Sequence, residues 1–179
     1  MKEIDELTIR QAAKKDQKAF RRVYDHYVSF LWKVVYRTVN GDADAAREIV
    51  QDTFVRVYVS LSSFAFNSAL STWLYRIAFN TANTYLAKKS SKGAIRGLDM
   101  DRLVDKKMTS DYASEDMVSA LLRTMTPEER FLITSREVEG VPFEELAKIM
   151  GKSSESLRTQ VSRIKERMRA IYGQLFKES

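Results

Sequence analysis

The sequence predicts an all-α protein of two small helical domains joined by a flexible linker. Apolar residues recur at helical spacing through most of the 179 residues. The chain has only six Gly and two Pro, so turns are few. Apolar residues make up 44% of the chain, enough to fill two small cores. We assign residues 1–90 to the first domain, 91–113 to the linker and 114–179 to the second, a four-helix module with a helix-turn-helix.

Composition excludes several classes of site. The chain has no Cys and one His, which rules out disulfides and a zinc site built from these residue types. It contains no apolar run of 18 residues and no apolar signal segment near its start. We therefore expect a cytoplasmic protein without membrane insertion, without a cofactor or metal ion and without catalytic residues.

Charge is distributed in blocks. The net charge is +6 and the pI is near 9.5, which favours nucleic acid or an acidic surface as a partner. Residues 53–98 contain six bases and no acid, residues 99–145 carry a net charge of −6, and residues 146–179 carry +5. Solvated helix faces explain any one block, but 46 residues without an acid favour nucleic-acid binding.

Three helices are expected in the first domain. Asp16 is a suitable N-cap for a helix that ends at Asn40-Gly41. Asp42 can cap the next helix, which continues to about Leu61. After a polar break, helical spacing resumes over residues 70–89. Residues such as Val and Thr near position 55 favour strands, but no hairpin turn follows them.

The linker holds two Gly and many charges without sustained periodicity, and leaves room for one short helix. Beyond it we predict helices at about 114–124, 127–138, 143–150 and 154–172. Thr126-Pro127-Glu128-Glu129 has the pattern of a capping box with Pro at the first helical position. Gly140 and Gly151 fit helix ends.

The last two helices have the pattern of a helix-turn-helix. Small Ala147 allows the close crossing that such a motif needs. The second helix then exposes side chains that bind phosphates and base edges in a major groove: Ser156, Arg158, Thr159, Ser162, Arg163 and Arg167. An ordinary helical hairpin is the alternative. We favour DNA binding because the pattern coincides with the basic block.

A loop and a helix face in the first domain point to partners. Phe64 and Phe66 lie outside any helical stripe, beside Asn67 and Ser68 and before a basic helix. Rings next to positive charge can hold unstacked single-stranded bases, although a single aromatic residue more often belongs to a core. Further upstream, Glu48 and Asp52 lie one turn apart on an acidic face, which is either solvated or binds a basic protein.

Two stretches resemble extracytoplasmic-function sigma factors. Asp44-Ala-Ala-Arg-Glu-Ile-Val-Gln-Asp-Thr-Phe-Val-Arg-Val-Tyr and Leu70-Ser-Thr-Trp-Leu-Tyr-Arg-Ile-Ala-Phe-Asn-Thr-Ala are similar to their second region. The helix-turn-helix with Met125-Thr-Pro-Glu-Glu-Arg and Glu137-Val-Glu-Gly resembles their fourth region. The chain departs from the family in the loop, where relatives often carry Arg-Gly-Asp after Phe64. It also departs at Glu155, where relatives usually have Gly, and at Gln160, where they usually have a base.

The resemblance implies a non-enzymatic subunit that binds core RNA polymerase and promoter DNA, helps melt the duplex, and is controlled by an anti-sigma factor. It places docking on the clamp helices of the largest polymerase subunit at Glu48, Gln51, Asp52, Phe54 and Arg56. It places contacts with the minus-ten element at Phe64, Asn67, Ser68, Trp73, Arg76, Asn80, Lys88 and Lys89. The exposed residues of the last helix would contact the minus-thirty-five element.

Three other classes compete with this hypothesis. A response-regulator-type transcription factor carries a similar C-terminal motif but needs a βαβ receiver, and residues 1–90 show no strand pattern. An enzyme is disfavoured because no motif orders the Ser, Asp and Glu residues around His26. A helical interaction module without DNA would lack the steep salt dependence of DNA binding.

Overall fold

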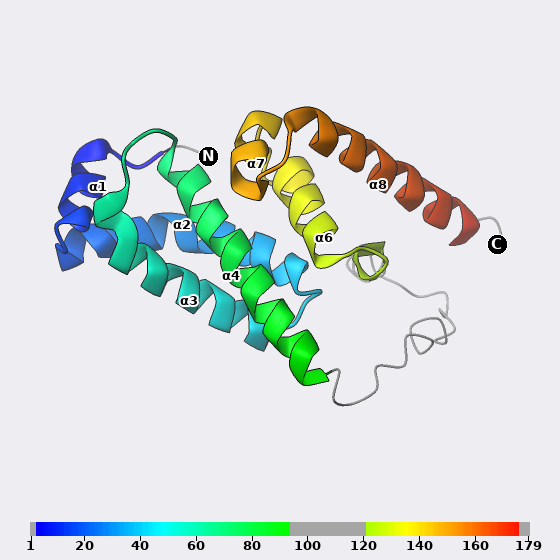
Figure 1. Ribbon diagram of the computed structural model, residues 1–179, viewed down its shortest axis with the longest axis horizontal. Coiled ribbons are helices and arrows are strands. Elements are labelled where there is room, and N and C mark those ends of the chain that lie inside the picture. Colours follow the sequence, from blue (N-terminus) through cyan, green and yellow to red (C-terminus); the bar gives the residue numbers. More distant parts are fainter. Residues whose placement is uncertain (1–2, 94–120, 176–179) are drawn as a thin grey trace.

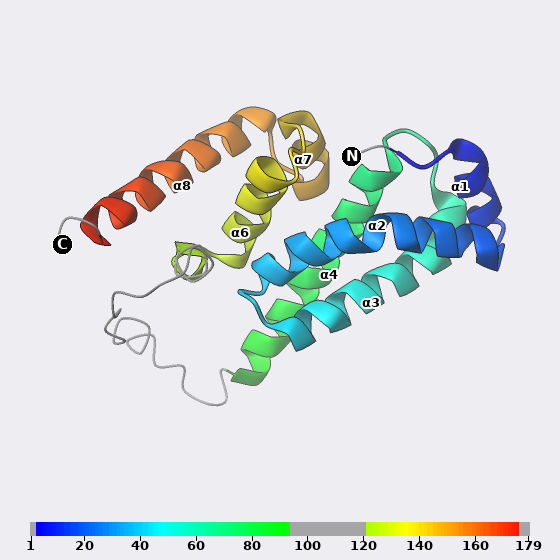
Figure 2. The same ribbon diagram turned by 180° about the vertical axis from the view of Figure 1, so that it is seen from behind.

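The structure is a computed structural model that describes residues 3–93 and 121–175. The predicted all-α class is confirmed, since the described residues contain no strand. Figures 1 and 2 show α1 (Glu6–Ala13), α2 (Gln17–Thr38), α3 (Ala43–Ser60), η1 (Leu61–Ser63), α4 (Leu70–Gly93), α6 (Pro127–Ile133), η3 (Thr134–Val138), α7 (Phe143–Met150) and α8 (Ser154–Leu175). Residues 94–113 of the predicted linker, and residues 114–120 of the helix predicted after it, lie outside the described residues.

The N-terminal module, residues 3–93, packs α2, α3 and α4 around one core (Figure 2). The predicted N-caps are present: the Asp16 carboxylate accepts a hydrogen bond from the Ala19 N–H at 2.8 Å, and that of Asp42 accepts one from the Ala45 N–H at 2.9 Å. The turn between α2 and α3 has positive φ at Asn40 and Gly41. With helices throughout its described residues, this module is not a βαβ receiver.

The first helix, α1, is not predicted by the sequence analysis. Its N-cap Asp5 accepts hydrogen bonds from both the N–H and the hydroxyl of Thr8 at 2.8 Å. Ile9 and Ala12 are buried against α2. Eight residues with so few buried apolar positions give a weak periodic signal, although the Asp5–Thr8 spacing is a capping pattern.

The C-terminal module, residues 121–175, begins with the predicted capping box. The Thr126 hydroxyl accepts from the Glu129 N–H, and the Glu129 carboxylate accepts from the Thr126 N–H at 2.9 Å. The single helix predicted over 127–138 changes at Thr134 into the π-helical turn η3. Gly151 ends α7 in the left-handed conformation at φ +68°, as a helix-turn-helix requires.

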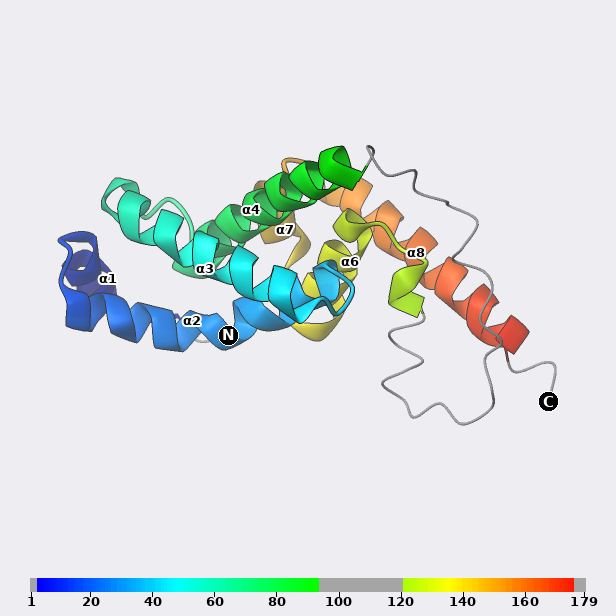
Figure 3. The ribbon, with the colours of Figure 1, turned by 90° about the horizontal axis from the view of Figure 1, so that it is seen from below.

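The two modules contact each other, so that α6 and α7 lie against α4 and the C-terminal half of α2 (Figures 1 and 3). The Thr72 hydroxyl donates to the Glu145 carboxylate at 2.5 Å. The Phe79 and Phe131 rings lie 4.8 Å apart between centroids. Burial, together with the charge of Glu139, raises the pKa of Tyr75 above its ordinary value. These residues give α4 a second buried face besides the one in its own module.

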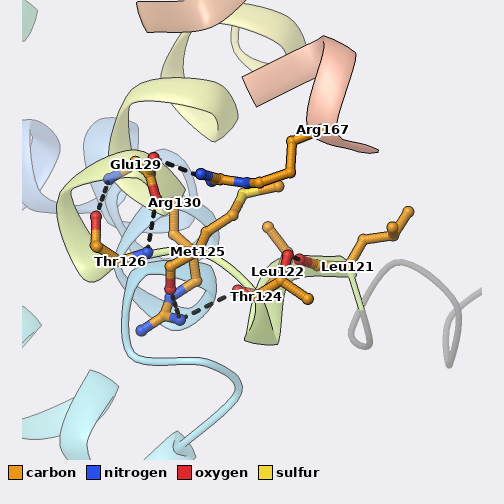
Figure 4. A network of polar contacts seen from close by, with 8 residues as sticks. All are labelled: Leu121, Leu122, Thr124, Met125, Thr126, Glu129, Arg130 and Arg167. Atoms are coloured by element: carbon orange, nitrogen blue, oxygen red, sulfur yellow. Dashed lines mark hydrogen bonds and ion pairs between the residues drawn. The ribbon is translucent and has the colours of Figure 1, made fainter. Parts of the chain in front are cut away.

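A buried guanidinium joins the modules, and Figure 4 shows its hydrogen bonds within the C-terminal module. Arg130 is 8% exposed, and its Nε donates to the Thr38 carbonyl of α2 at 2.9 Å. Its Nη1 donates to the carbonyls of Leu122 and Met125 at 3.1 and 2.6 Å. Burial lowers the pKa of Arg130, but three carbonyls replace much of the lost hydration of the cation.

None of the described helices is both long enough and apolar enough to cross a membrane.

Candidate functional site

The acidic face of α3 is open to solvent. Glu48, Gln51, Asp52 and Arg56 are all exposed, as the sequence analysis predicts for a docking surface. Phe54 is different, because it is only 5% exposed and its ring packs against that of Tyr24 at 4.6 Å. Phe54 therefore lies beneath this surface, at the wall of a neighbouring groove.

An apolar groove of about 520 Å³ lies beside this face, between α2 and α3. Gln51 lines both the groove and the acidic face, so the two features form one continuous surface. Val55, with 56% of its surface exposed, adds an apolar side chain at the boundary. The groove is lined by Phe20, Tyr24, Val28, Trp32, Arg47, Val50, Gln51, Phe54, Val55 and Tyr58. The sequence analysis missed it, because its residues fit the periodicity of two ordinary amphipathic helices.

The loop before α4 exposes one of its two rings. Phe64 is 8% exposed and lies between the rings of Phe66, at 4.8 Å, and Trp73, at 5.4 Å. Because Phe64 is buried here, the direct contact with DNA that the sequence analysis predicts for it stays a prediction. Phe66 and Asn67 are exposed, while Ser68 is half-buried. The ring open to solvent in this loop is therefore that of Phe66.

The start of α4 supplies a polar stripe next to the loop. Arg76 and Asn80 are exposed one turn apart, while Trp73 is half-buried against Phe64. Lys88 is exposed near the end of the helix. Lys89 instead forms an ion pair with Asp42 at 3.0 Å, which raises the pKa of this lysine. The stripe thus combines one amide and two cations that are free to meet a polyanion.

The last helix, α8, presents the side chains that the sequence analysis predicts on its outer surface. Ser156, Arg158, Thr159, Ser162 and Arg163 are all exposed. Thr159 and Ser162 also make short-range hydrogen bonds, to the Glu155 carbonyl at 3.1 Å and to the Glu166 carboxylate at 3.4 Å. These side chains extend over about two turns of α8, the length that fits a major groove.

Arg158 contacts α7. Its Nη2 donates to the Glu144 carboxylate at 2.8 Å, and its guanidinium lies 5.0 Å from the centroid of the Phe143 ring. Arg136 of η3 lies 4.6 Å from the same ring centroid. A hydrogen bond from its own backbone N–H, followed by the contact with Arg158, lowers the pKa of Glu144. Arg158 keeps further N–H donors for a base edge.

Arg167 lies apart from this group. Its Nη2 pairs with the Glu129 carboxylate at 3.0 Å, so it connects α8 to the capping box of α6 (Figure 4). Among the described residues Arg163 makes no ion pair, which leaves its charge available for a phosphate. Arg167 is itself exposed, so its contact with DNA stays a prediction alongside this ion pair.

Comparisons with known proteins define the class. Residues 23–92 match the family Sigma-70 region 2, and residues 115–168 match Sigma-70, region 4. One chain with both regions has the organisation of a sigma factor.

The extracytoplasmic-function (ECF) RNA polymerase sigma-E factor of Escherichia coli K12 is 33% identical over 178 residues, covering 90% of this chain and 91% of the relative. The sigma-E factor of Haemophilus influenzae is 27% identical, with coverages of 90% and 92%. The chain belongs to the ECF RNA polymerase sigma factors, and it directs RNA polymerase to promoters.

Solved structures show the same fold. CnrH, in complex with the cytosolic domain of CnrY, is 21% identical with a TM-score of 0.70, covering 94% of this chain and 96% of CnrH. The sigma factor RpoE of Bartonella quintana, in complex with the anti-sigma factor NepR, is also 21% identical, with a TM-score of 0.69 and coverages of 87% and 97%.

Proposed function

We propose that this sigma factor binds core RNA polymerase through the exposed residues of α3 and the groove beside them. The acidic side chains Glu48 and Asp52 would attract a basic surface, and Val55 with the groove would bury apolar side chains. The clamp helices of the largest polymerase subunit are the proposed partner. The coincidence of acidic and apolar groups on one open surface supports this assignment.

The loop at residues 64–68 and the exposed stripe of α4 are the proposed contact with the minus-ten element. Asn67 and Asn80 offer amide groups that can donate to and accept from a base edge. Arg76 and Lys88 supply positive charge for the strand backbone. Since strand separation frees bases for such contacts, this surface would stabilise melted DNA more than closed duplex.

The helix α8 is the proposed reader of the minus-thirty-five element. Ser156, Arg158 and Thr159 lie in its first two turns, where helix-turn-helix proteins meet base edges. Arg163 lies further along and would contact a phosphate, which contributes affinity for any sequence. The exposed guanidinium of Arg158 near the start of α8 carries this part of the proposal.

The protein would act in the cytoplasm at the nucleoid, without chemistry of its own. Regulation by an anti-sigma factor is proposed from the relatives, since the solved RpoE structure contains such a factor.

Run-off transcription with purified core polymerase tests the proposal. We expect transcripts from a defined set of genomic promoters with this protein and none with core polymerase alone. An Asp52→Arg variant should lose most transcription because it binds core poorly, while a Lys18→Glu variant, exposed at the start of α2, provides a charge-reversal control. Normal transcription with Asp52→Arg would remove α3 from the docking surface.

A further inference from the structure

The start of α4 lacks the capping side chain that the other long helices have. Asp16 and Asp42 accept hydrogen bonds from N–H groups in the first turns of α2 and α3, and Ser153 does so for α8. Before α4 this position is Ala69, whose carbonyl accepts from the Trp73 N–H at 3.3 Å but whose side chain cannot accept a hydrogen bond. The first turn of α4 also has no acidic residue. Its first N–H groups therefore need an acceptor from elsewhere in the molecule.

Glu3 supplies this acceptor from the other end of the module. Its Oε2 accepts a hydrogen bond from the N–H of Ser71, 68 residues further along the chain, at 3.4 Å. Ser71 is the second residue of α4, one of the positions whose N–H an N-cap side chain normally binds. The carboxylate of Glu3 thus lies at the positive end of the helix dipole of α4.

A buried tyrosine holds the Glu3 carboxylate in this position. Tyr27 of α2 is 1% exposed, and its hydroxyl donates to the same Oε2 of Glu3 at 2.8 Å. The Ile4 N–H donates to the Tyr27 hydroxyl at 3.4 Å. Burial, together with the hydrogen bond to Glu3, raises the pKa of Tyr27 above its ordinary value, so the hydroxyl keeps the proton that it donates. Glu3 therefore connects the middle of α2 to the first turn of α4.

The position of Ser71 gives this connection a consequence for DNA binding. Ser71 lies between the loop at residues 64–68 and the exposed side chains of Arg76 and Asn80. The first turn of α4 therefore decides how the loop and these side chains lie relative to each other. An exposed carboxylate by itself repels a polyanion, so Glu3 can favour DNA binding only through the position of α4.

We propose that Glu3 is a positioning residue, the N-cap of α4 supplied from outside the helix, which holds the first turn of α4 in the arrangement that binds melted DNA. This inference rests on the proposed role of α4 at the minus-ten element. It adds to that surface a residue outside residues 23–92, which match Sigma-70 region 2.

Glu3→Ala tests the proposal, because charge and capping predict opposite results. Removing a negative charge alone should strengthen binding to DNA. Loss of the cap should instead weaken holoenzyme binding to a template with a pre-melted bubble about 2- to 30-fold, the change in the stability of a helix turn that loss of one N-cap produces. Binding to core polymerase, proposed for α3, should not change. Asp25→Ala is the matched control, because it removes an exposed carboxylate whose partner, Arg21, lies on its own helix. It should not weaken bubble binding.

A local cap at the start of α4 should make Glu3 dispensable. Ala69 is exposed, so a serine hydroxyl at this position can accept from the first turn as Ser153 does in α8. We expect the double variant Glu3→Ala/Ala69→Ser to recover the bubble affinity of the parent. The substitution at Ala69 does not replace the acceptor that Tyr27 loses, so the recovery would come from α4.

The outcomes separate this inference from the proposed function. If Glu3→Ala and Asp25→Ala bind the bubble alike while Asn80→Ala binds it weakly, α4 holds melted DNA but Glu3 does not position it. If neither Glu3→Ala nor Asn80→Ala weakens bubble binding, the assignment of α4 to melted DNA is wrong as well. If Ala69→Ser fails to restore the affinity that Glu3→Ala loses, the loss arises elsewhere in the module and Glu3 does not act as the cap of α4.

Discussion

One of the contacts between the two modules is a hydrogen bond that a single isosteric substitution removes. Thr72 is 6% exposed, and its hydroxyl donates to the Glu145 carboxylate at 2.5 Å. Hydrogen bonds to charged groups contribute about 1.5–3 kcal/mol. In a Thr72→Val variant Glu145 would keep Lys148 as a partner, at 2.9 Å, so we expect the lower end of this range. A loss of about 1.5 kcal/mol increases the undocked fraction about tenfold relative to the docked one.

Fluorescence energy transfer within single molecules measures this change. The natural chain has no Cys, so the substitutions Ser90→Cys and Arg169→Cys provide two specific labelling sites, one at the end of α4 and one on α8. Thr84→Val is the matched control, because the exposed Thr84 hydroxyl bonds only to a carbonyl of its own helix. If Thr72→Val and Thr84→Val give the same distribution of transfer efficiencies as the parent, the hydrogen bond does not stabilise docking and the reasoning fails.

Three further predictions follow from the other contacts. Asp52→Arg should weaken binding to core polymerase at least tenfold in a titration without changing the helical circular-dichroism signal, because it reverses charge on an exposed face. Glu144→Gln should relax base preference at the base pair that Arg158 reads. Glu137→Gln, which breaks another exposed ion pair with α8, should not change base preference. Competition binding on a base-substituted library compares the two variants. The hydrogen bond that Glu145 accepts from Thr72 lowers the pKa of Glu145 despite partial burial. The stabilisation of docking by ionised Glu145 is therefore present above the ordinary glutamate pKa of about 4.3 and is lost as the pH falls through the lower pKa of the docked state. An acid titration followed by energy transfer should show this loss as undocking.

Local signals in the sequence predict most helix boundaries. The carboxylates of Asp16 and Asp42 and the capping box at Thr126 act on groups three residues away, so the sequence pattern alone contains the interaction. Gly151 likewise marks the turn of the helix-turn-helix. The periodicity of the sequence does not reveal the change to a π-helix at Thr134.

Tertiary contacts explain the remaining differences. Phe64 and Phe66 have similar surroundings in the sequence, but in the structure Phe64 is buried, whereas Phe66 has positive φ and is partly exposed. In the sequence Arg130 has the pattern of an ordinary charged residue on an amphipathic helix. In the structure it donates to the carbonyls of Leu122, 8 residues away, and Thr38, 92 residues away. Long-range acceptors of this kind leave no mark on a local pattern.

The arrangement of α4 limits where promoter preference can change during evolution. Its first half packs on two sides: Leu74 and Ala78 are buried in the N-terminal core, and Phe79 packs against Phe131 of the other module. Among the described residues of that half, Arg76 and Asn80 remain exposed and pack neither in the N-terminal core nor against the other module. Variation at these two positions and in the preceding loop changes the DNA contact with little effect on folding. A library confined to them is therefore the economical way to redirect this sigma factor to new promoters.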